Sequence, residues 1–191
     1  IYNCTYMNLL ATPVPSVFLP VPAGPTGLCR HPGYARGVRG TEPRAGGNVR
    51  GAVRADLLSV FRIETRSFEQ PWPYTAFERF LGAPGFLVAE AEGSVVGYVV
   101  GDTIEMGAAP VGHIKDLAVA PGHRRRGLGR RLLSRALGAL AAAGVGRVKL
   151  EVRRSNEAAR GLYSSFGFEP HHVVPGYYDD GEDAHVLVKR W

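Results

Sequence analysis

The sequence predicts an α/β fold in which helices cover a mixed β-sheet. Through the C-terminal half, amphipathic helical segments alternate with short apolar strands, and strand–helix–strand units of this kind place their strands parallel. Near the middle, two strand-like stretches are separated only by Glu92-Gly93-Ser94 and therefore form an antiparallel hairpin. With 191 residues, 45% of them hydrophobic, the chain is large and apolar enough for one such domain.

The composition changes near residue 48 and divides the chain into an N-terminal extension, residues 1–47, and a folded domain, residues 48–191. The extension holds seven of the fourteen prolines and no sustained helical or alternating pattern, so we expect it to be poorly structured. It also carries most of the positive charge, because residues 1–50 have five arginines and one glutamate. The folded domain is nearly balanced, and nucleic acid is therefore not an expected partner for it.

Composition excludes several classes of protein. No apolar run reaches the roughly 18 residues that a membrane-spanning helix needs, so we expect a soluble protein with no membrane partner. Both cysteines, Cys4 and Cys29, lie in the extension, and neither a disulfide framework nor a cysteine zinc site can organise the domain. A reducing cytoplasm is the simplest compartment, and no metal is expected.

The elements of the domain follow from hydrophobic periodicity and from turn residues. Asp56 suits the first turn of the first helix, Pro71-Trp72-Pro73 separates that helix from the second, and Gly82 ends the second. Strands are predicted at residues 48–53, 86–91, 95–104, 113–119, 147–152, 168–174 and 184–189, and helices at 56–68, 75–81, 127–143 and 156–166. The third helix is amphipathic, with a core-facing stripe of Leu128, Leu132, Leu133, Ala136, Leu137 and Leu140.

A turn with anion-binding chemistry, Arg124-Arg125-Arg126-Gly127-Leu128-Gly129, lies between the strand at 113–119 and the third helix. The first turn of a helix has unpaired N–H groups and partial positive charge, and the two glycines let a phosphate approach the backbone. Leu132 stands where a dinucleotide fingerprint needs its third glycine, and no Gly-Lys-Ser/Thr of a P-loop is present. The chemistry suits a pyrophosphate, and a merely solvated basic helix start is the alternative.

The strand that follows carries polar side chains on one face. Its even-numbered residues are apolar, whereas Lys149, Glu151 and Arg153 share the other face, which indicates a cleft if the strand is central. Taken alone, Glu151 reads as a surface carboxylate paired with a neighbouring basic residue. Tyr163 has the helical spacing of a core aromatic residue, and that is its simplest interpretation in isolation.

These residues resemble the GNAT acetyltransferase superfamily, whose acetyl-CoA loop has the pattern Gln/Arg-x-x-Gly-x-Gly/Ala, here Arg124-x-x-Gly127-x-Gly129. Over about residues 48–191 the chain is similar to the protein N-terminal acetyltransferases of the RimI and archaeal Ard1 type. The further matching stretches are Ile63-Glu64, Ser67-Phe68, Pro71-Trp72, Leu150-Glu151-Val152-Arg153-x-Ser155-Asn156, Leu162-Tyr163-x-x-Phe166-Gly167-Phe168 and Gly176-Tyr177-Tyr178-x-Asp180-Gly181-Glu182-Asp183-Ala184.

The resemblance implies a GNAT-like, mostly antiparallel mixed sheet with a central splayed pair of parallel strands and helices on both faces. It implies acetyl-CoA as co-substrate, Glu151 as the general base near the substrate amine, and Tyr163 as the general acid beside the CoA sulfur. Asn156 has a second expected role as a helix N-cap. The residues implied to bind acetyl-CoA are Leu117, Ala118, Val119, Arg124, Arg125, Arg126, Gly127, Leu128, Gly129, Arg130, Asn156 and Tyr163.

The implied substrate is a protein or peptide N-terminus, with ribosomal proteins among the candidates, and the expected assembly is a monomer or weak dimer. An α-amine has a pKa of about 7.7–8.0, so a base must remove its proton before it attacks, and a modestly raised pKa is expected to help Glu151. His113 taken alone reads as an ordinary histidine in a strand. The residues expected to line the substrate side are Phe68, Pro71, Trp72, Tyr74, His113, Asp116, Tyr177 and Tyr178.

Two other functions fit the same sequence. A second enzyme would transfer the acetyl group to a small amine such as a polyamine or an antibiotic, and a panel of peptides and small amines separates the two substrates. A non-catalytic CoA-binding or ribosome-associated module would use Arg124 to Arg126 and the basic extension, and the presence of both Glu151 and Tyr163 argues against it.

Overall fold

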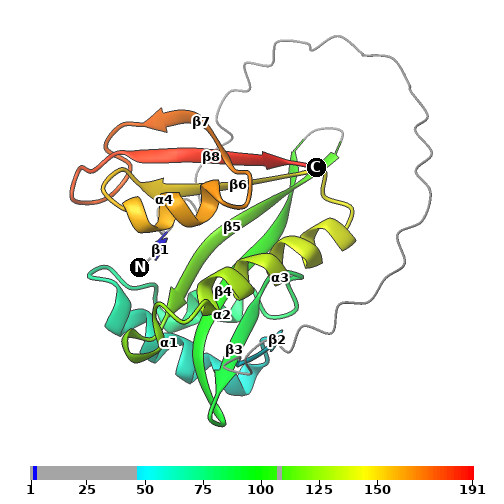
Figure 1. Ribbon diagram of the computed structural model, residues 1–191, viewed down its shortest axis with the longest axis vertical. Coiled ribbons are helices and arrows are strands. Elements are labelled where there is room, and N and C mark those ends of the chain that lie inside the picture. The colour runs from blue at the N-terminus through cyan, green and yellow to red at the C-terminus, as the bar shows by residue number, and fades with distance from the viewer. Residues whose placement is uncertain (1, 4–46, 107–108) are drawn as a thin grey trace, which may run out of the picture.

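The computed structural model describes residues 2–3, 47–106 and 109–191, and the predicted order of elements in the domain is confirmed (Figure 1). Two short 3-10 turns, η1 (Arg54–Asp56) and η2 (Pro121–His123), lie before the first and third helices. The helices are α1 (Leu57–Ser67), α2 (Tyr74–Glu78), α3 (Leu128–Ala142) and α4 (Glu157–Ser164). The strands are β1 (Tyr2–Asn3), β2 (Asn48–Gly51), β3 (Leu87–Ala91), β4 (Ser94–Met106), β5 (Ala109–Val119), β6 (Arg147–Arg153), β7 (Glu169–Val174) and β8 (Ala184–Arg190).

One sheet runs through the domain in the order β2-β3-β4-β5-β6-β8-β7. Among the described strands only β5 and β6 pair in parallel, and they do so over a short stretch, Gly112–Ile114 against Val148–Leu150. Beyond that stretch the two strands diverge (Figure 1), so the expected splayed parallel pair is confirmed. The two-residue β1 lies against the edge of β5 where the strands have separated, with Tyr2 opposite Leu117 and Asn3 opposite Asp116. The rest of the extension, apart from residue 47, lies outside the described residues.

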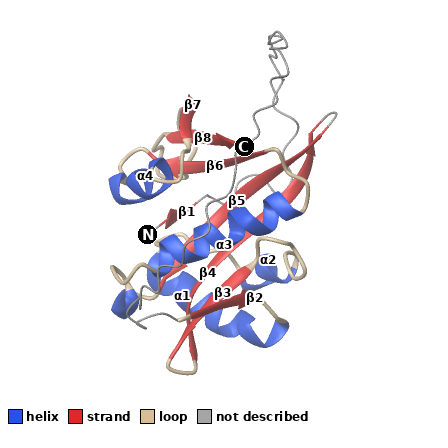
Figure 2. Ribbon diagram, turned by 45° about the vertical axis from the view of Figure 1, so that its right-hand side comes forward, coloured by secondary structure: helices blue, strands red, loops and turns tan. Residues whose placement is uncertain are grey.

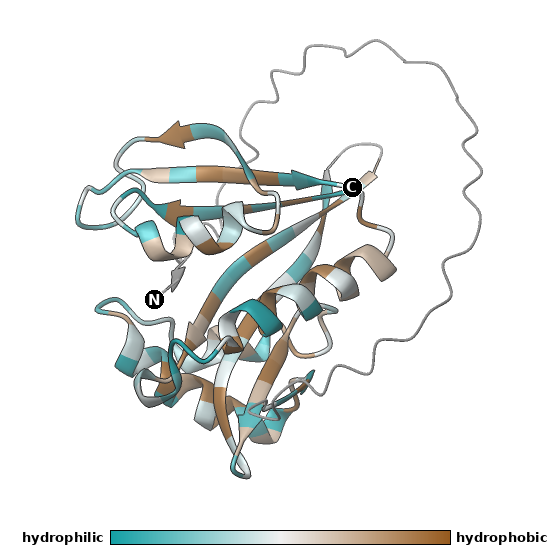
Figure 3. Cartoon of the chain, viewed as in Figure 1, coloured by the Kyte–Doolittle hydropathy of each residue, from teal (hydrophilic) through white to brown (hydrophobic). Residues whose placement is uncertain are grey.

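Helices cover both faces of the sheet (Figure 2). Helices α3 and α4 pack on one face, where the six leucines and alanines of the predicted α3 stripe are all buried. Helices α1 and α2 pack on the other, over an aromatic core that includes Trp72, Phe77, Phe86 and Tyr98. Apolar residues alternate with polar ones along the central strands, as the brown and teal bands show (Figure 3). No helix in the described part of the chain is both long and apolar enough to cross a membrane.

Strand β5 begins at Ala109, four residues before the predicted start, and β4 extends to Met106. Pro110 lacks a donor and Gly112 is a poor strand former, so the local pattern conceals this part of the strand. Pairing with β4 stabilises this part of the strand, where Ile104 lies opposite Val111. Gly112 is required for a different reason, because a Cβ at this position would approach a Val148 methyl carbon to 2.7 Å.

A β-bulge interrupts β5 close to the point where it leaves β6. Asp116 lies opposite Val100 and Ile114 lies opposite Gly101, so Lys115 is the extra residue of the bulge. Two residues on one strand then face one on the other, which shifts the alternation of side chains along β5. Consequently Lys115 and Asp116 both contact groups on the α1–α2 side, whereas Ile114 and Leu117 belong to the α3 core.

Candidate active site

Four polar side chains form a continuous chain of contacts across β5 and β6, on the α1–α2 side of the sheet. The parallel register pairs His113 with Lys149. Glu151 lies two residues beyond Lys149, and one carboxylate oxygen, Oε2, is 2.6 Å from the His113 Nε2 atom. Its other oxygen, Oε1, accepts a hydrogen bond of 2.9 Å from the Lys149 ammonium. Lys115 completes the chain, because its Nζ atom is 3.2 Å from the His113 Nδ1 atom.

The contacts determine the protonation of the pair at the centre. Burial raises the pKa of Glu151, but contacts with His113 and Lys149 outweigh burial and hold the pKa below its usual value. Burial lowers the pKa of His113 and favours the neutral ring. A neutral ring must donate from Nε2 to the carboxylate, which leaves the Nδ1 lone pair as an acceptor facing Lys115. The modestly raised pKa expected of Glu151 is wrong, because two donors stabilise the charged form.

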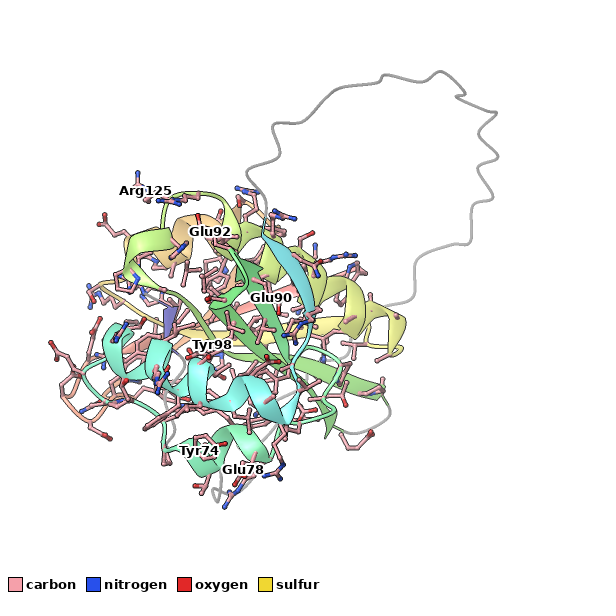
Figure 4. All side chains as sticks on the ribbon, turned by 90° about the horizontal axis from the view of Figure 1, so that it is seen from below. Tyr74, Glu78, Glu90, Glu92, Tyr98 and Arg125 are labelled. Atoms are coloured by element: carbon pink, nitrogen blue, oxygen red, sulfur yellow. The ribbon has the colours of Figure 1, made fainter. Side chains whose placement is uncertain are left out.

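A second cluster, Glu64, Tyr98 and Asp116, is buried on the α1–α2 side of the sheet, and Figure 4 labels its tyrosine. The Tyr98 hydroxyl contacts a carboxylate oxygen of Glu64 and is 2.6 Å from Asp116 Oδ2. A hydroxyl has one proton, so one of the two carboxyl groups must carry a proton to complete both contacts. Burial and the nearby charge of Glu64 raise the pKa of Asp116 well above its usual value, which places the proton there.

This cluster ties the loop after α1 to the sheet. Glu64 Oε1 accepts a hydrogen bond of 2.8 Å from the backbone N–H of Trp72, and Asp116 Oδ1 accepts one of 2.8 Å from Leu117. The expectation that Asp116 contacts the substrate is wrong for this conformation, because its side chain is 1% exposed and occupied by Tyr98 and Leu117. Through these contacts Asp116 holds Tyr98 and the backbone of β5 in place beside the site.

Replacing Asp116 with asparagine is expected to stabilise the protein at alkaline pH. An acid with a raised folded-state pKa contributes stability that is complete below its unfolded pKa of about 3.9 and is lost as the pH rises through the folded pKa. Asparagine is neutral at every pH, and its amide can accept from Leu117 and donate to Tyr98. We expect Asp116→Asn to raise the free energy of unfolding by about 1–3 kcal/mol at pH 8 and to change it little at pH 4. Urea titrations at both pH values measure the difference, and an equal loss of stability at both would contradict the assignment.

The predicted anion-binding turn opens α3 as expected, but its arginines differ in position. Gly127 is the N-cap of α3 with φ of 79°, so glycine is needed here for backbone conformation. Arg125, labelled in Figure 4, also has a positive φ of 64°, which is unusual for a residue with a side chain. Arg125 and Arg126 are exposed. Arg124 instead donates to the Val119 carbonyl oxygen and to Ser67 Oγ, at 2.9 and 3.2 Å, so its side chain holds the turn in place.

Other predicted acetyl-CoA contacts lie on the α3–α4 side. The Asn156 side chain accepts a hydrogen bond of 3.1 Å from Ala159, which confirms its N-cap role. Tyr163 packs edge-on against Phe168 in the α3 core and is 3% exposed. Arg130 bridges to α4, because it donates to Ser165 Oγ at 2.9 Å. Leu128 is buried, Gly129 is half-buried, and Leu117, Ala118 and Val119 have buried side chains, so only their backbone groups are available for contacts.

The residues predicted for the substrate side come from two loops. In the loop before α2, Pro71 is exposed, Phe68 and Tyr74 are half-buried, and Trp72 is buried in the aromatic core. In the loop between β7 and β8, Tyr177 is half-buried and Tyr178 is buried.

Arg153 organises the second of these loops. Its guanidinium lies 3.9 Å from the centre of the Tyr178 ring and binds the carboxylates of Asp180 and Glu182 at 2.7 and 2.8 Å. Tyr178 therefore supports the loop.

The sequence reasoning missed Lys115, Lys149, Glu64 and Tyr98 as members of the site. A signal for Glu64 was present, since a charged residue occupies a core-facing position of α1, between Val60 and Phe68. Alternation places Lys115 on the face of His113, whereas the bulge reverses the face that alternation would give Asp116, so the contacts of Asp116 with Tyr98 could not be read from the sequence.

Diverging parallel strands, a glycine-capped helix at the end of one and a carboxylate–imidazole pair between them define an α/β acyltransferase. The chain belongs to the acetyltransferase (GNAT) family, whose family model matches residues 57–168. It is therefore an enzyme of the N-acetyltransferase type, as the sequence resemblance implied.

Individual relatives show which members of the family this chain is similar to. The chain is 33% identical to an N-alpha-acetyltransferase of Sulfurisphaera tokodaii, over 81% of this chain and 97% of the relative. It is 36% identical to a putative ribosomal protein bS18-alanine N-acetyltransferase of Bacillus subtilis, over 73% of this chain and 92% of that protein. Among solved structures, Ard1 from Thermoplasma volcanium superimposes with a TM-score of 0.70 and 28% identity, covering 76% of this chain and 98% of the other. These relatives support acetylation of protein N-termini.

Proposed function

We propose that this protein transfers the acetyl group of acetyl-CoA directly to the α-amine of a protein N-terminus. The observation that carries the proposal is the Glu151–His113 pair, which lies on the polar face of the two strands that diverge. The named relatives support the substrate class, because one is named an N-alpha-acetyltransferase and another a putative ribosomal protein bS18-alanine N-acetyltransferase. The cytoplasm remains the proposed compartment.

Glu151 supplies the carboxylate of the general base. Its low pKa keeps it ionised at neutral pH, and the neutral His113 ring donates to it from Nε2 and so orients the carboxylate. An amine proton passes to this carboxylate, directly or through a water, and the amine nitrogen then bonds to the acetyl carbon. When the carbon–sulfur bond breaks, Tyr163 donates its proton to the leaving thiolate. We expect a modest gain from Tyr163, because a thiol with a pKa near 8.5 leaves readily.

The edge of β5 beyond its last contact with β6 is the proposed position of the acetyl-CoA chain. Backbone groups of Leu117 to Val119 lie on this stretch, and those not already bonded to Asp116 or Arg124 can pair with amide groups and stabilise an oxyanion. The diphosphate would then lie at the N-terminus of α3, near Arg125 and Arg126. Because β1 pairs with Leu117 on the same edge, bound acetyl-CoA has to displace β1.

Incubation with acetyl-CoA and a panel of peptides tests the function. The panel holds Ala-, Ser- and Met-initiated peptides, the same peptides with a blocked N-terminus, and small amines such as a polyamine. We expect mass spectrometry to locate one acetyl group on the α-nitrogen of the free peptides. Acetylation of the small amines alone would instead assign the enzyme to small-molecule substrates, and heat from acetyl-CoA binding without any product would indicate a binding module.

A further inference from the structure

The loop at 68–73, which joins α1 to α2, is bounded by two buried residues. Ser67 is the last residue of α1, and Trp72 lies two residues before the start of α2. The residues between them at 69–71 are exposed. The position of this exposed stretch therefore depends on the contacts that hold its two ends.

The Trp72 end is connected to β5 through the buried cluster of Glu64, Tyr98 and Asp116. Glu64 Oε1 accepts a hydrogen bond of 2.8 Å from the Trp72 backbone N–H, and the Tyr98 hydroxyl joins Glu64 to Asp116. Asp116 Oδ1 in turn accepts a hydrogen bond of 2.8 Å from the Leu117 backbone. The three side chains of the cluster are buried, so water does not compete for these hydrogen bonds.

The Ser67 end is connected to the same strand through Arg124. The Arg124 Nη2 atom donates to Ser67 Oγ at 3.2 Å, and its Nε atom donates to the Val119 carbonyl oxygen at 2.9 Å. A guanidinium is planar and its donors have a fixed geometry, so one side chain holds both acceptors at a set separation. This second connection ends on the backbone of Val119.

Both connections reach one short segment of β5, residues 117–119. This segment is the proposed partner of the acetyl-CoA chain, and the loop at 68–73 is expected to contact the peptide. The reacting atoms of the two substrates must come within about 3–3.5 Å of each other, so the two binding segments need a fixed relative position. Two separate connections between the same two segments supply it.

We infer that Glu64, Tyr98 and Arg124 are positioning residues that hold the peptide-binding loop in place against the acetyl-CoA segment of β5. The inference rests on the proposed function, since it takes the loop at 68–73 as part of the peptide site. The three residues act through the two ends of the loop and through the backbone of β5.

The experiment cuts each connection on the side of the loop. Ser67→Ala removes one acceptor of Arg124, and Glu64→Leu removes the acceptor of the Trp72 N–H, while the hydrogen bonds to Leu117 and Val119 stay in place. A loop released at one end is in its binding position for a smaller fraction of the time, which lowers the apparent affinity for the peptide by that fraction.

We expect KM for an Ala-initiated peptide to rise about threefold in Ser67→Ala and about tenfold in Glu64→Leu. The kcat should stay within about twofold of wild type, because the complex reacts normally once it has formed. The Kd for acetyl-CoA, measured by calorimetry, should not change. Initial rates at several peptide concentrations under saturating acetyl-CoA give KM and kcat separately.

Two further variants separate positioning from a general loss of stability. Glu64→Gln should keep KM within about twofold of wild type, because its amide can accept from Trp72 and donate to Tyr98. Leu140→Ala is the matched control, since Leu140 is fully buried in the α3 core on the other face of the sheet. It should lower the free energy of unfolding and leave the peptide KM unchanged.

A purely structural role gives a different result, because misfolded enzyme lowers the apparent kcat and leaves KM as it is. Peptide KM unchanged in both Ser67→Ala and Glu64→Leu, or a loss confined to kcat, would overturn the inference. If Glu64→Leu does not fold, KM of Ser67→Ala alone decides. Failure of wild type to acetylate the free peptide would instead refute the proposed function.

Discussion

Replacing Glu151 with glutamine is expected to lower the rate of acetyl transfer by about 10²–10⁴-fold, the usual contribution of a positioned acid or base. The amide keeps the size of the side chain and can still accept the hydrogen bond from His113, but it cannot take a proton. The protein should fold normally because Lys149, its side chain 30% exposed, can turn to water. Initial rates with an Ala-initiated peptide under saturating acetyl-CoA measure the loss.

Two controls make this result specific to the base. Calorimetry with acetyl-CoA should give the same affinity for wild type and Glu151→Gln, since the carboxylate is not among the proposed acetyl-CoA contacts. Glu105→Gln removes an exposed carboxylate from β4 and should leave the rate unchanged. Tyr163→Phe is expected to lose less than Glu151→Gln. A wild-type rate for Glu151→Gln would refute the assignment of the base.

The largest loss of stability is expected from Phe77→Ala. Phe77 is fully buried, and its ring centre lies 5.5 Å from that of Trp72, 6.4 Å from that of Phe86 and 5.6 Å, edge-on, from that of Tyr98. Truncation of a buried phenylalanine typically costs about 3–5 kcal/mol, through lost transfer energy and the cavity left behind. Phe77 is fully buried in α2 and contacts Trp72 of the preceding loop, so the loop at 68–73 should also lose order, and KM for the peptide should rise.

Urea denaturation measures the change in unfolding free energy, and Leu58→Ala is the matched control. Leu58 lies on α1 with 51% of its surface exposed, so its truncation should change stability by less than about 0.5 kcal/mol. Equal losses of unfolding free energy in the two variants would show that the aromatic core does not stabilise the α1–α2 side of the domain. A large loss for Phe77→Ala with unchanged KM would separate the stability of α2 from the positioning of the loop.

Local sequence patterns were sufficient to predict the features that depend on burial against the core or on neighbouring residues. The stripe on α3, the alternation of β6 and the N-cap at Asn156 were predicted correctly, because each depends on spacing within a few residues. The residues of the site are another matter. Glu151 and Tyr163 were selected by family resemblance, since either one alone has an ordinary structural interpretation.

What the sequence could not predict depends on distant contacts. The early start of β5 needs β4 as a partner, and Pro110 and Gly112 conceal it locally. The cluster of Glu64, Tyr98 and Asp116 joins residues 34 and 18 positions apart, and its shared proton follows only from seeing both carboxyl groups around one hydroxyl. The low pKa of Glu151 likewise depends on Lys149 and His113 meeting across two strands.

The extra residue at the bulge of β5 shifts the alternation of side chains within a single strand. Before it, the strand presents His113 to the carboxylate of its parallel neighbour; after it, the same strand presents Leu117 to the hydrophobic interior under α3. Deleting one residue at this point would restore a regular ladder of hydrogen bonds with β4. It would also turn the side chains on one side of the deletion to the opposite face of the sheet. The length of the segment from 113 to 117 is therefore constrained by two interiors that must be satisfied at once.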